Sequence, residues 1–269
     1  MAEAPPLLEV RDLRVVYDRA IRALHGVSLK VTAGQMVAVL GANGAGKSTT
    51  LRAISGFIGL DKASIAGGAI LYRGEPIANL PPHQITRRGI VLVPEREKVF
   101  PNLTVLENIT AVASSRAGTA KRRRLEAMVF EYFPRLAELR GREAGLLSGG
   151  ERQMLAIGAA LACDPELLLV DELSLGLAPV IVQDLARRLI EIRRGLGITI
   201  LLVEQSATVA LAIADYLYIL ENGRQALEGP AATLRDNDAV RQSYLGGAKE
   251  GRVNYREAAI RRRAAVPDV

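Results

Sequence analysis

The chain has 269 residues, of which 49% are hydrophobic, with one cysteine and a formal charge of +6. One cysteine excludes an internal disulfide, and the length suits one large domain or a domain with a subdomain. Tryptophan is absent and aromatic residues make up only 4%, which argues against a carbohydrate or single-stranded nucleic-acid platform built on stacking. The acidic, proline-interrupted start is not typical of a signal peptide, and no run approaches the roughly 18 apolar residues that cross a bilayer. We therefore expect a protein that is soluble by itself.

Basic residues gather in two segments. From Lys249 onward, six Lys and Arg side chains outnumber three acidic ones, and Lys121–Arg124 form an uninterrupted basic run. Solvated helix surface is the favoured interpretation of Lys121–Arg124. The tail, residues 248–269, stays open between contact with anionic lipid, contact with a neighbouring subunit, and disorder. Cys163 ends an apolar stretch and is interpreted as a small buried hydrophobic residue.

Strand-like runs recur along the chain and predict an α/β fold. They cover residues 7–17, 27–31, 35–40, 69–77, 90–93, 166–170 and 198–203. Near-continuous apolar strands that alternate with helices predict a parallel sheet covered on both faces. The segment of about 96–165 breaks this alternation, with a helical pattern from about Val105 to Arg140, and is expected to be an inserted helical subdomain. Asn222-Gly223 between two strand-like runs predicts a hairpin.

A glycine-rich segment after the strand at 35–40 predicts a phosphate site. It reads GANGAGKST and precedes a predicted helix, which is the context that a P-loop requires. Its backbone N–H groups would turn toward phosphate oxygens, Lys47 would reach the β- and γ-phosphates, and the Ser48 hydroxyl would bind Mg²⁺. The predicted nucleotide-binding residues are Gly41, Ala42, Asn43, Gly44, Ala45, Gly46, Lys47, Ser48 and Thr49.

Two carboxylates follow the buried strand LLLV. Asp171 and Glu172 stand at its carboxyl end, where ligands of open α/β sheets bind. Asp171 is expected to hold Mg²⁺ directly or through water, and Glu172 to polarise an attacking water. Alone, such a pair would indicate only a strand-end turn, but beside a P-loop the catalytic interpretation is favoured.

A second candidate phosphate site lies about a hundred residues after the first. The segment LSGGE places Ser148, Gly149, Gly150 and Glu151 at the start of a predicted helix whose inward stripe includes Met154. A helix start with small residues and free N–H groups favours an anion. This site lacks a lysine, unlike the P-loop.

GANGAGKST, LSGGERQ and LLLVDE, in this order and spacing, resemble the ATPase subunit of an ATP-binding cassette (ABC) transporter, over about residues 7–247. The resemblance implies a P-loop NTPase of ABC type: a mixed sheet core, an N-terminal antiparallel β subdomain and the inserted helical subdomain, with the basic tail at 248–269 beyond it. It also implies that two ATPase domains pack head to tail. The signature of one, Ser148–Glu151 here, would then face the ATP held by the P-loop of the other. The resemblance further places Tyr17 against adenine, although a strand tyrosine in a half-buried sheet remains the alternative.

Several positions depart from the usual family pattern. Glu95 stands where a glutamine near Mg²⁺ and the attacking water is common, and Gln205 stands where a histidine contacting the γ-phosphate is common. Glu95 could ligate the metal, and Gln205 could hydrogen-bond phosphate without being a cation. Leu173 and Ala178 replace a common proline and aspartate. The two histidines of the chain, His25 and His83, are far from Gln205 in sequence.

Together VPE, VFPNLTVLENI, SLGLAP, VEQ and SYLGG resemble the LivF-type ATPase of branched-chain amino-acid importers. The resemblance implies ATP and Mg²⁺ as ligands, a second and different ATPase subunit, two transmembrane permease subunits and, indirectly, an extracytoplasmic solute-binding protein. It places the chain peripherally on the cytoplasmic face of the inner membrane, with no nucleic-acid partner. Phe100, in the loop after Glu95, is expected to contact the permease, with packing inside the helical subdomain as the alternative role.

Other functions stay open from the sequence. Relatives of this subgroup serve urea, amides and other small solutes, and an ATPase that does not touch the solute cannot reveal it. A soluble ABC ATPase acting on nucleic acid or ribosomes is disfavoured because the chain has one cassette and no sustained heptads. A catalytically weak subunit is suggested by Glu95 and Gln205 but disfavoured by Lys47, Asp171 and Glu172.

Overall fold

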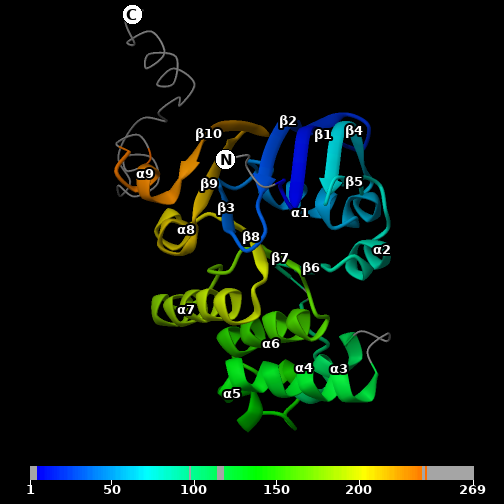
Figure 1. Ribbon diagram of the computed structural model, residues 1–269, viewed down its shortest axis with the longest axis vertical. Coiled ribbons are helices and arrows are strands. Elements are labelled where there is room, and N and C mark those ends of the chain that lie inside the picture. The colour runs from blue at the N-terminus through cyan, green and yellow to red at the C-terminus, as the bar shows by residue number, and fades with distance from the viewer. Residues whose placement is uncertain (1–4, 97, 114–117, 238–239, 241–269) are drawn as a thin grey trace, which may run out of the picture.

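An antiparallel sheet forms the N-terminal part of the fold (Figure 1). The computed structural model describes residues 5–96, 98–113, 118–237 and 240. The sheet has the order β2-β1-β4-β5, with β1 and β4 paired along their lengths. Its strands are β1 (Leu8–Tyr17), β2 (Ile21–Val31), β4 (Ala63–Tyr72) and β5 (Glu75–Pro76). The antiparallel N-terminal sheet expected from the family resemblance is therefore present.

A second sheet carries the predicted parallel strands, in the order β10-β9-β3-β8-β7-β6. These strands are β3 (Met36–Leu40), β6 (Ile90–Val93), β7 (Leu167–Asp171), β8 (Thr199–Glu204), β9 (Tyr216–Glu221) and β10 (Arg224–Pro230). Strands β3, β7 and β8 are buried at every residue, as continuous apolar runs predict. Among the described strands of this sheet, β10 is the one that runs antiparallel, and the predicted hairpin joins it to β9. Asn222 and Gly223 have φ values of 48° and 71°, as a type I′ turn requires.

Alternate residues of the central strands pack into two different cores, because side chains alternate across a sheet. Val37 and Val39 of β3 face the core shared with the antiparallel sheet and α1 (Lys47–Ile54). Ala38 and Leu40 face the core covered by α6 (Gly149–Ala162), α7 (Pro179–Leu196) and α8 (Ala207–Ile213). Because β3 and β7 both pair with β8 in parallel, the carboxyl ends of these three strands lie at the same edge of the sheet.

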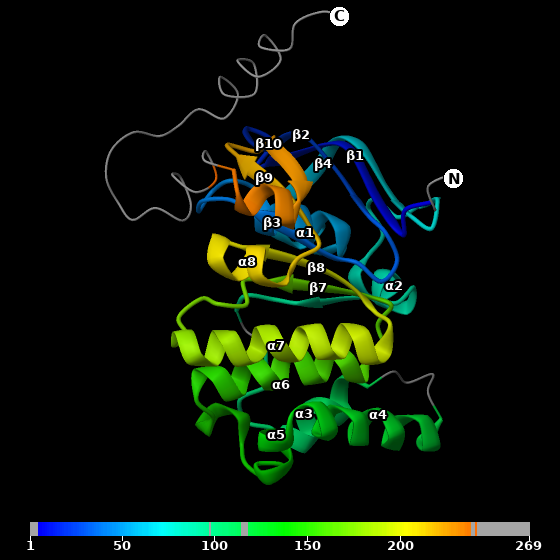
Figure 2. The same cartoon turned by 60° about the vertical axis from the view of Figure 1, so that its left-hand side comes forward.

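The helical pattern from Val105 to Arg140 is not one helix. It forms three helices: α3 (Val105–Val112), α4 (Thr119–Tyr132) and α5 (Pro134–Glu138). Gly118 is the N-cap of α4, and Pro134 starts α5, because proline has no N–H for an intrahelical bond and clashes with the preceding turn. Figure 2 shows α3, α4 and α5 at the end far from the antiparallel sheet, with α6 and α7 between them and the strands.

The remaining short elements are η1 (Phe57–Asp61), α2 (Pro82–Arg87), η2 (Ala144–Leu146) and α9 (Ala231–Arg235). Among the described residues, no helix combines the length and apolarity that a membrane span needs. The basic tail expected at residues 248–269 lies outside the described residues. All four residues of Lys121–Arg124 are exposed on α4, and Lys121 pairs with Asp164. Cys163 is the C-cap of α6; it is half-buried rather than buried as expected, and its thiol donates to the Val112 carbonyl.

Candidate nucleotide site

The predicted P-loop connects β3 to α1 and exposes Ala42, Asn43 and Gly44. Gly46 is the N-cap of α1 with a φ of 101°, a conformation that side-chain-bearing residues rarely adopt. The hairpin after β9 supports this loop, since Gly223 donates its N–H to the Ala45 carbonyl over 3.0 Å. The sequence predicted the hairpin but not its contact with the P-loop.

Lys47 and Glu172 form a buried ion pair. Lys47 Nζ lies 3.5 Å from Glu172 Oε1, and the two side chains are 4% and 9% exposed. The ammonium also donates to the Ala42 carbonyl over 3.2 Å. Glu172 itself has a φ of 52°, and its N–H donates to the Val203 carbonyl. Two predicted functional groups, far apart in sequence, thus contact each other directly.

Ser48 and Asp171 form a second pair beside the first. The Ser48 hydroxyl donates to Asp171 Oδ1 over 2.9 Å. Burial raises the pKa of Asp171 to about 6; the Ser48 hydrogen bond opposes this, while the nearby Glu95 and Glu172 charges add to it. No group of three or more His, Cys, Asp or Glu side chains suited to a metal occurs among the described residues. A hydroxyl beside one or two carboxylates fits Mg²⁺, which is usually held by few protein groups together with substrate phosphates.

Glu95 follows β6 and Gln205 follows β8, the two strands that flank β7 and its carboxylates. Glu95 is half-buried just after β6, near enough to Asp171 to raise its pKa, and accepts from Arg96 Nε over 3.1 Å. Gln205 directly follows β8 and is exposed. The histidines are elsewhere: His25 lies in β2 and His83 in α2.

Tyr17 lies next to the P-loop helix. Its hydroxyl is 3.4 Å from the Thr49 hydroxyl, and its side chain is half-buried at the end of β1. The side chain packs against the core under the antiparallel sheet but is only partly buried, so the geometry allows both the stacking role and the structural alternative.

The segment 148–151 begins a helix, as predicted. Ser148 is the N-cap of α6 and forms a capping box with Glu151, each side chain accepting from the other's backbone N–H. Glu151 also accepts from Arg135 Nε over 3.0 Å. The hydrogen bonds from Ser148, the largest cause, and then Arg135 lower the pKa of Glu151. The capping box therefore uses one of the helix-start N–H groups expected to be free, whereas Ser148 and Gly149 remain exposed.

Gly150 is buried where α6 packs against α7. A Cβ atom at Gly150 would lie 2.8 Å from Ile181 Cγ2 of α7, so the missing side chain lets α6 and α7 approach. A surface hollow of about 460 Å³ lies at this helix start, and the loop before α7 forms its other wall through Gly176, Leu177 and Ala178. None of the P-loop residues lines this hollow.

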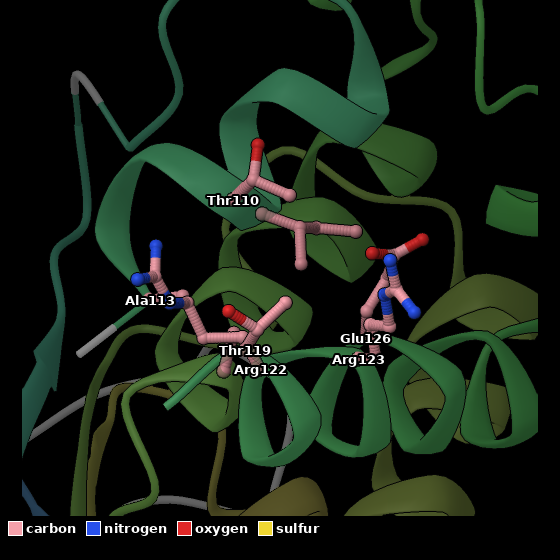
Figure 3. A pocket seen from close by; sticks show the side chains of 8 residues that line it. Thr110, Ala113, Thr119, Arg122, Arg123 and Glu126 are labelled. Carbon is pink, nitrogen blue, oxygen red and sulfur yellow. The ribbon is translucent and has the colours of Figure 1, made fainter. Parts of the chain in front are cut away.

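A different cavity, of about 240 Å³, lies between α3 and α4 (Figure 3). Thr110, Thr119, Arg122, Arg123 and Glu126 line it. It contains none of the predicted site residues, so it is separate from both candidate phosphate sites.

Two contacts near the site were not predicted from the sequence. Lys98 reaches from the loop after Glu95 to Gln153 of α6, and burial lowers its pKa. Glu204, the acidic residue before Gln205, is fully buried and binds Ser174. An acidic residue that ends an apolar strand was the only sequence signal for Glu204.

The comparisons with known proteins agree with this geometry. Residues 24–174 match the family model described as ABC transporter. The chain is 46% identical over 231 residues to the high-affinity branched-chain amino acid transport ATP-binding protein BraG of Pseudomonas aeruginosa, covering 86% of this chain and 96% of BraG. It is 36% identical to the probable branched-chain amino acid transport ATP-binding protein LivF of Archaeoglobus fulgidus, covering 85% and 94%. The lipopolysaccharide export ATP-binding protein LptB of Haemophilus influenzae is 33% identical, with 89% and 97% covered.

Solved structures show the same fold. An ATP-binding cassette of an ABC transporter in its ADP conformation superimposes with a TM-score of 0.76 at 27% identity, covering 90% of this chain and 99% of that one. A nucleotide-free ATP-binding cassette gives a TM-score of 0.73 at 28% identity, covering 84% and 91%.

Proposed function

Because the chain belongs to the ABC transporter ATPase family, we propose that it powers an importer of branched-chain or other hydrophobic amino acids. The observation that carries this proposal is the 46% identity to BraG over nearly the whole of both chains. The more distant LptB relatives serve export, and their lower identity favours the importer.

The P-loop half binds the chain's own ATP in this proposal. Backbone N–H groups of residues 41–46 surround the β-phosphate, and the Lys47 ammonium leaves Glu172 for the β- and γ-phosphates. Tyr17 stacks on adenine beside Thr49. The buried ion pair between Lys47 and Glu172 supports this assignment, because it brings the ammonium and the carboxylate together beside the P-loop.

Hydrolysis then depends on three carboxylates, those of Asp171, Glu95 and Glu172. Mg²⁺, when bound, supplies charge neutralisation at the phosphates, and Ser48 and Asp171 would hold it with help from Glu95. Glu172, once released by Lys47, accepts a proton from the attacking water, whose oxygen forms the new bond to phosphorus as the bond to the β-phosphate oxygen breaks. Gln205, at the adjoining strand end, donates a hydrogen bond to the γ-phosphate.

The signature half serves a neighbouring subunit. Ser148, Gly149 and the start of α6 are exposed, while Gly150 and Glu151 hold that start in place through α7 and Arg135. The positive end of the helix dipole and the Ser148 hydroxyl suit the γ-phosphate of another chain. A second ATPase subunit, normally a different one in the subgroup it resembles, is therefore part of the working enzyme.

Attachment to the membrane comes through permease subunits. Phe100 is 54% exposed in the loop between Glu95 and α3, and the Asn108 side chain fixes that loop by bonding the backbone of Phe100 and Leu103. An apolar side chain on a braced loop near the metal site suits contact with a permease on the cytoplasmic face.

The substrate class is tested by purifying the complex from membranes and adding its solute-binding protein. ATP hydrolysis in proteoliposomes is then measured with leucine, isoleucine, valine, urea or a short amide. We expect only the branched-chain amino acids to stimulate hydrolysis severalfold. Stimulation by urea or an amide alone would replace the amino-acid proposal, while leaving the ATPase assignment intact.

A further inference from the structure

Glu204 is a fully buried carboxylate at the end of β8, with 0% of its surface exposed. The preceding residues of this strand are apolar from Ile200 to Val203, so packing alone does not call for a charge here. A buried carboxylate is costly unless donors satisfy it. The hydrogen-bond donors around this carboxylate identify the loops that it connects.

The side chain joins two loops. Glu204 Oε1 accepts from the Ser174 backbone N–H over 3.0 Å, and Oε2 accepts from the Ser174 hydroxyl over 2.8 Å. Oε2 also accepts from the Ser206 N–H over 3.4 Å. Burial, the largest cause, raises the pKa of Glu204, whereas these donated bonds lower it.

Each connected loop belongs to the proposed catalytic machinery. Ser174 lies two residues after Glu172 and begins the loop whose later part, residues 176–178, lines the hollow at Ser148. Ser206 flanks Gln205 on the other side from Glu204. The backbone carbonyl of Glu204 adds a third connection, because it accepts from the N–H of Gly41, the first P-loop residue, over 3.3 Å.

We propose that Glu204 is a positioning residue that ties the loop after Glu172, the loop carrying Gln205 and the start of the P-loop into one unit. The inference rests on the proposed ATPase function. Because one carboxylate bonds both loops, a shift of residues 174–178 caused by a neighbouring subunit reaches Gln205 without a separate contact. ATP binding by the P-loop does not depend on the carboxylate's bonds to Ser174 and Ser206, whereas ATP turnover does.

Three variants separate this role from simple stability. In Glu204→Gln, the amide oxygen can still accept from the Ser174 N–H, but the amide NH₂ then faces the Ser206 N–H, so the link to Gln205 breaks. Ser174→Ala removes only the hydroxyl bond on the other side. Thr199→Val is the matched control: Thr199 is 1% exposed at the opposite end of β8, and its hydroxyl accepts from the Gly34 N–H over 2.9 Å.

Each variant is assembled into the membrane-purified complex, and ATP turnover, ATP affinity and thermal stability are measured together. We expect Glu204→Gln to lower kcat at least tenfold and Ser174→Ala about threefold, with ATP Kd changed less than twofold. The double variant should be no slower than Glu204→Gln alone, since both act on one link. Thr199→Val should lower the melting temperature about as much as Glu204→Gln does, while its kcat stays within twofold of the parent.

A kcat for Glu204→Gln within twofold of the parent would overturn the inference, as would a loss of kcat in Thr199→Val equal to that in Glu204→Gln. If Glu204→Gln does not fold, Ser174→Ala decides the matter, because unchanged turnover in that variant contradicts the link. Failure of the proposed function is recognised separately, because the parent complex would then show no ATP hydrolysis that a branched-chain amino acid stimulates.

Discussion

The two regions of the molecule proposed to bind a phosphate, the P-loop and the start of α6, differ in the groups that they offer. At the P-loop, a buried ammonium contacts a buried carboxylate, and a hydroxyl contacts a second carboxylate. At the start of α6 the groups are a helix N-terminus, the Ser148 hydroxyl and Glu151, whose charge Arg135 partly neutralises. The first region has the groups to bind and cleave a nucleotide, whereas the second has only groups that can complete a site.

This difference explains why one chain needs both regions. A helix N-terminus contributes roughly half a positive charge, worth about 0.3–1 kcal/mol at an exposed site, which is too little to hold ATP alone. Beside a nucleotide already held by another P-loop, the same charge acts where negative charge gathers during hydrolysis. Changes at the P-loop region should therefore affect both ATP binding and hydrolysis by this chain. Changes at the signature region should leave ATP binding by this chain unaffected.

The largest expected effect is at Glu172. Glu172→Gln removes the proposed base but keeps the side-chain shape, so kcat of the complex should fall at least about 100-fold, in the range of general-base catalysis. ATP should still bind the isolated chain, as measured by calorimetry. Retention of full hydrolysis by the assembled complex would remove Glu172 from the chemistry and leave the partner's site as the working one.

Asp171 should impose a pH dependence on the nucleotide-free chain. Its pKa rises from an ordinary 3.8 to about 6 on folding, so the folded state binds the proton more tightly than the unfolded state. Stability is then lost as pH rises from about 4 to 6, by up to about 3 kcal/mol for this group. Denaturant unfolding of Asp171→Asn should gain stability relative to the parent over that interval. A constant difference between the two proteins would contradict the shift.

A substitution at Phe100 tests whether the loop between Glu95 and α3 contacts the permease. Phe100→Asp should lower solute transport about tenfold while ATP affinity of the isolated chain stays within twofold, because the Asn108 bonds that fix the loop use the backbone. Phe100→Leu, which keeps an apolar surface, should retain most transport. An equal loss of transport and ATP affinity in Phe100→Asp would assign the side chain to packing instead.

The smallest effect is expected at Tyr17. An aromatic stacking contact is worth about 0.5–1.5 kcal/mol, so Tyr17→Ala should weaken ATP binding roughly two- to twelvefold. Tyr17→Phe keeps the ring and loses only the contact with Thr49, so its affinity should match that of the parent. If the two variants weaken binding equally, or the alanine variant loses only thermal stability, Tyr17 is a structural residue of the sheet.

Much of the fold follows from local patterns in the sequence. The runs VAVL, LLLV and ILLV predicted buried parallel strands because nothing but burial on both faces suits so many adjacent apolar residues. The hairpin followed from Asn222-Gly223, the residues that tolerate positive φ. The helical stretch from Val105 to Arg140 was predicted, but its division into α3, α4 and α5 was not, although α5 begins at Pro134, a residue that cannot continue a preceding helix.

The site was predictable as motifs but not as contacts. Lys47, Ser48, Asp171 and Glu172 each stood in a recognisable segment, yet the pairing of Lys47 with Glu172 depends on the order β3-β8-β7, which brings distant strand ends together. The link from Glu204 to Ser174 has the same origin. Gly150 was expected to face the partner's ATP with the rest of Ser148–Glu151. Its packing against Ile181 depends on how α6 and α7 cross, which the sequence does not show.

The most direct test of the two-region account asks which subunit loses its nucleotide. The assembled complex carrying Ser148→Arg in a tagged copy of this chain is incubated with 8-azido-ATP and vanadate, irradiated, and separated into its ATPase subunits. We predict that trapped label disappears from the neighbouring ATPase subunit and persists on the tagged chain. Loss of label from the tagged chain, with the neighbour unaffected, would contradict the claim that Ser148 completes a site on another subunit.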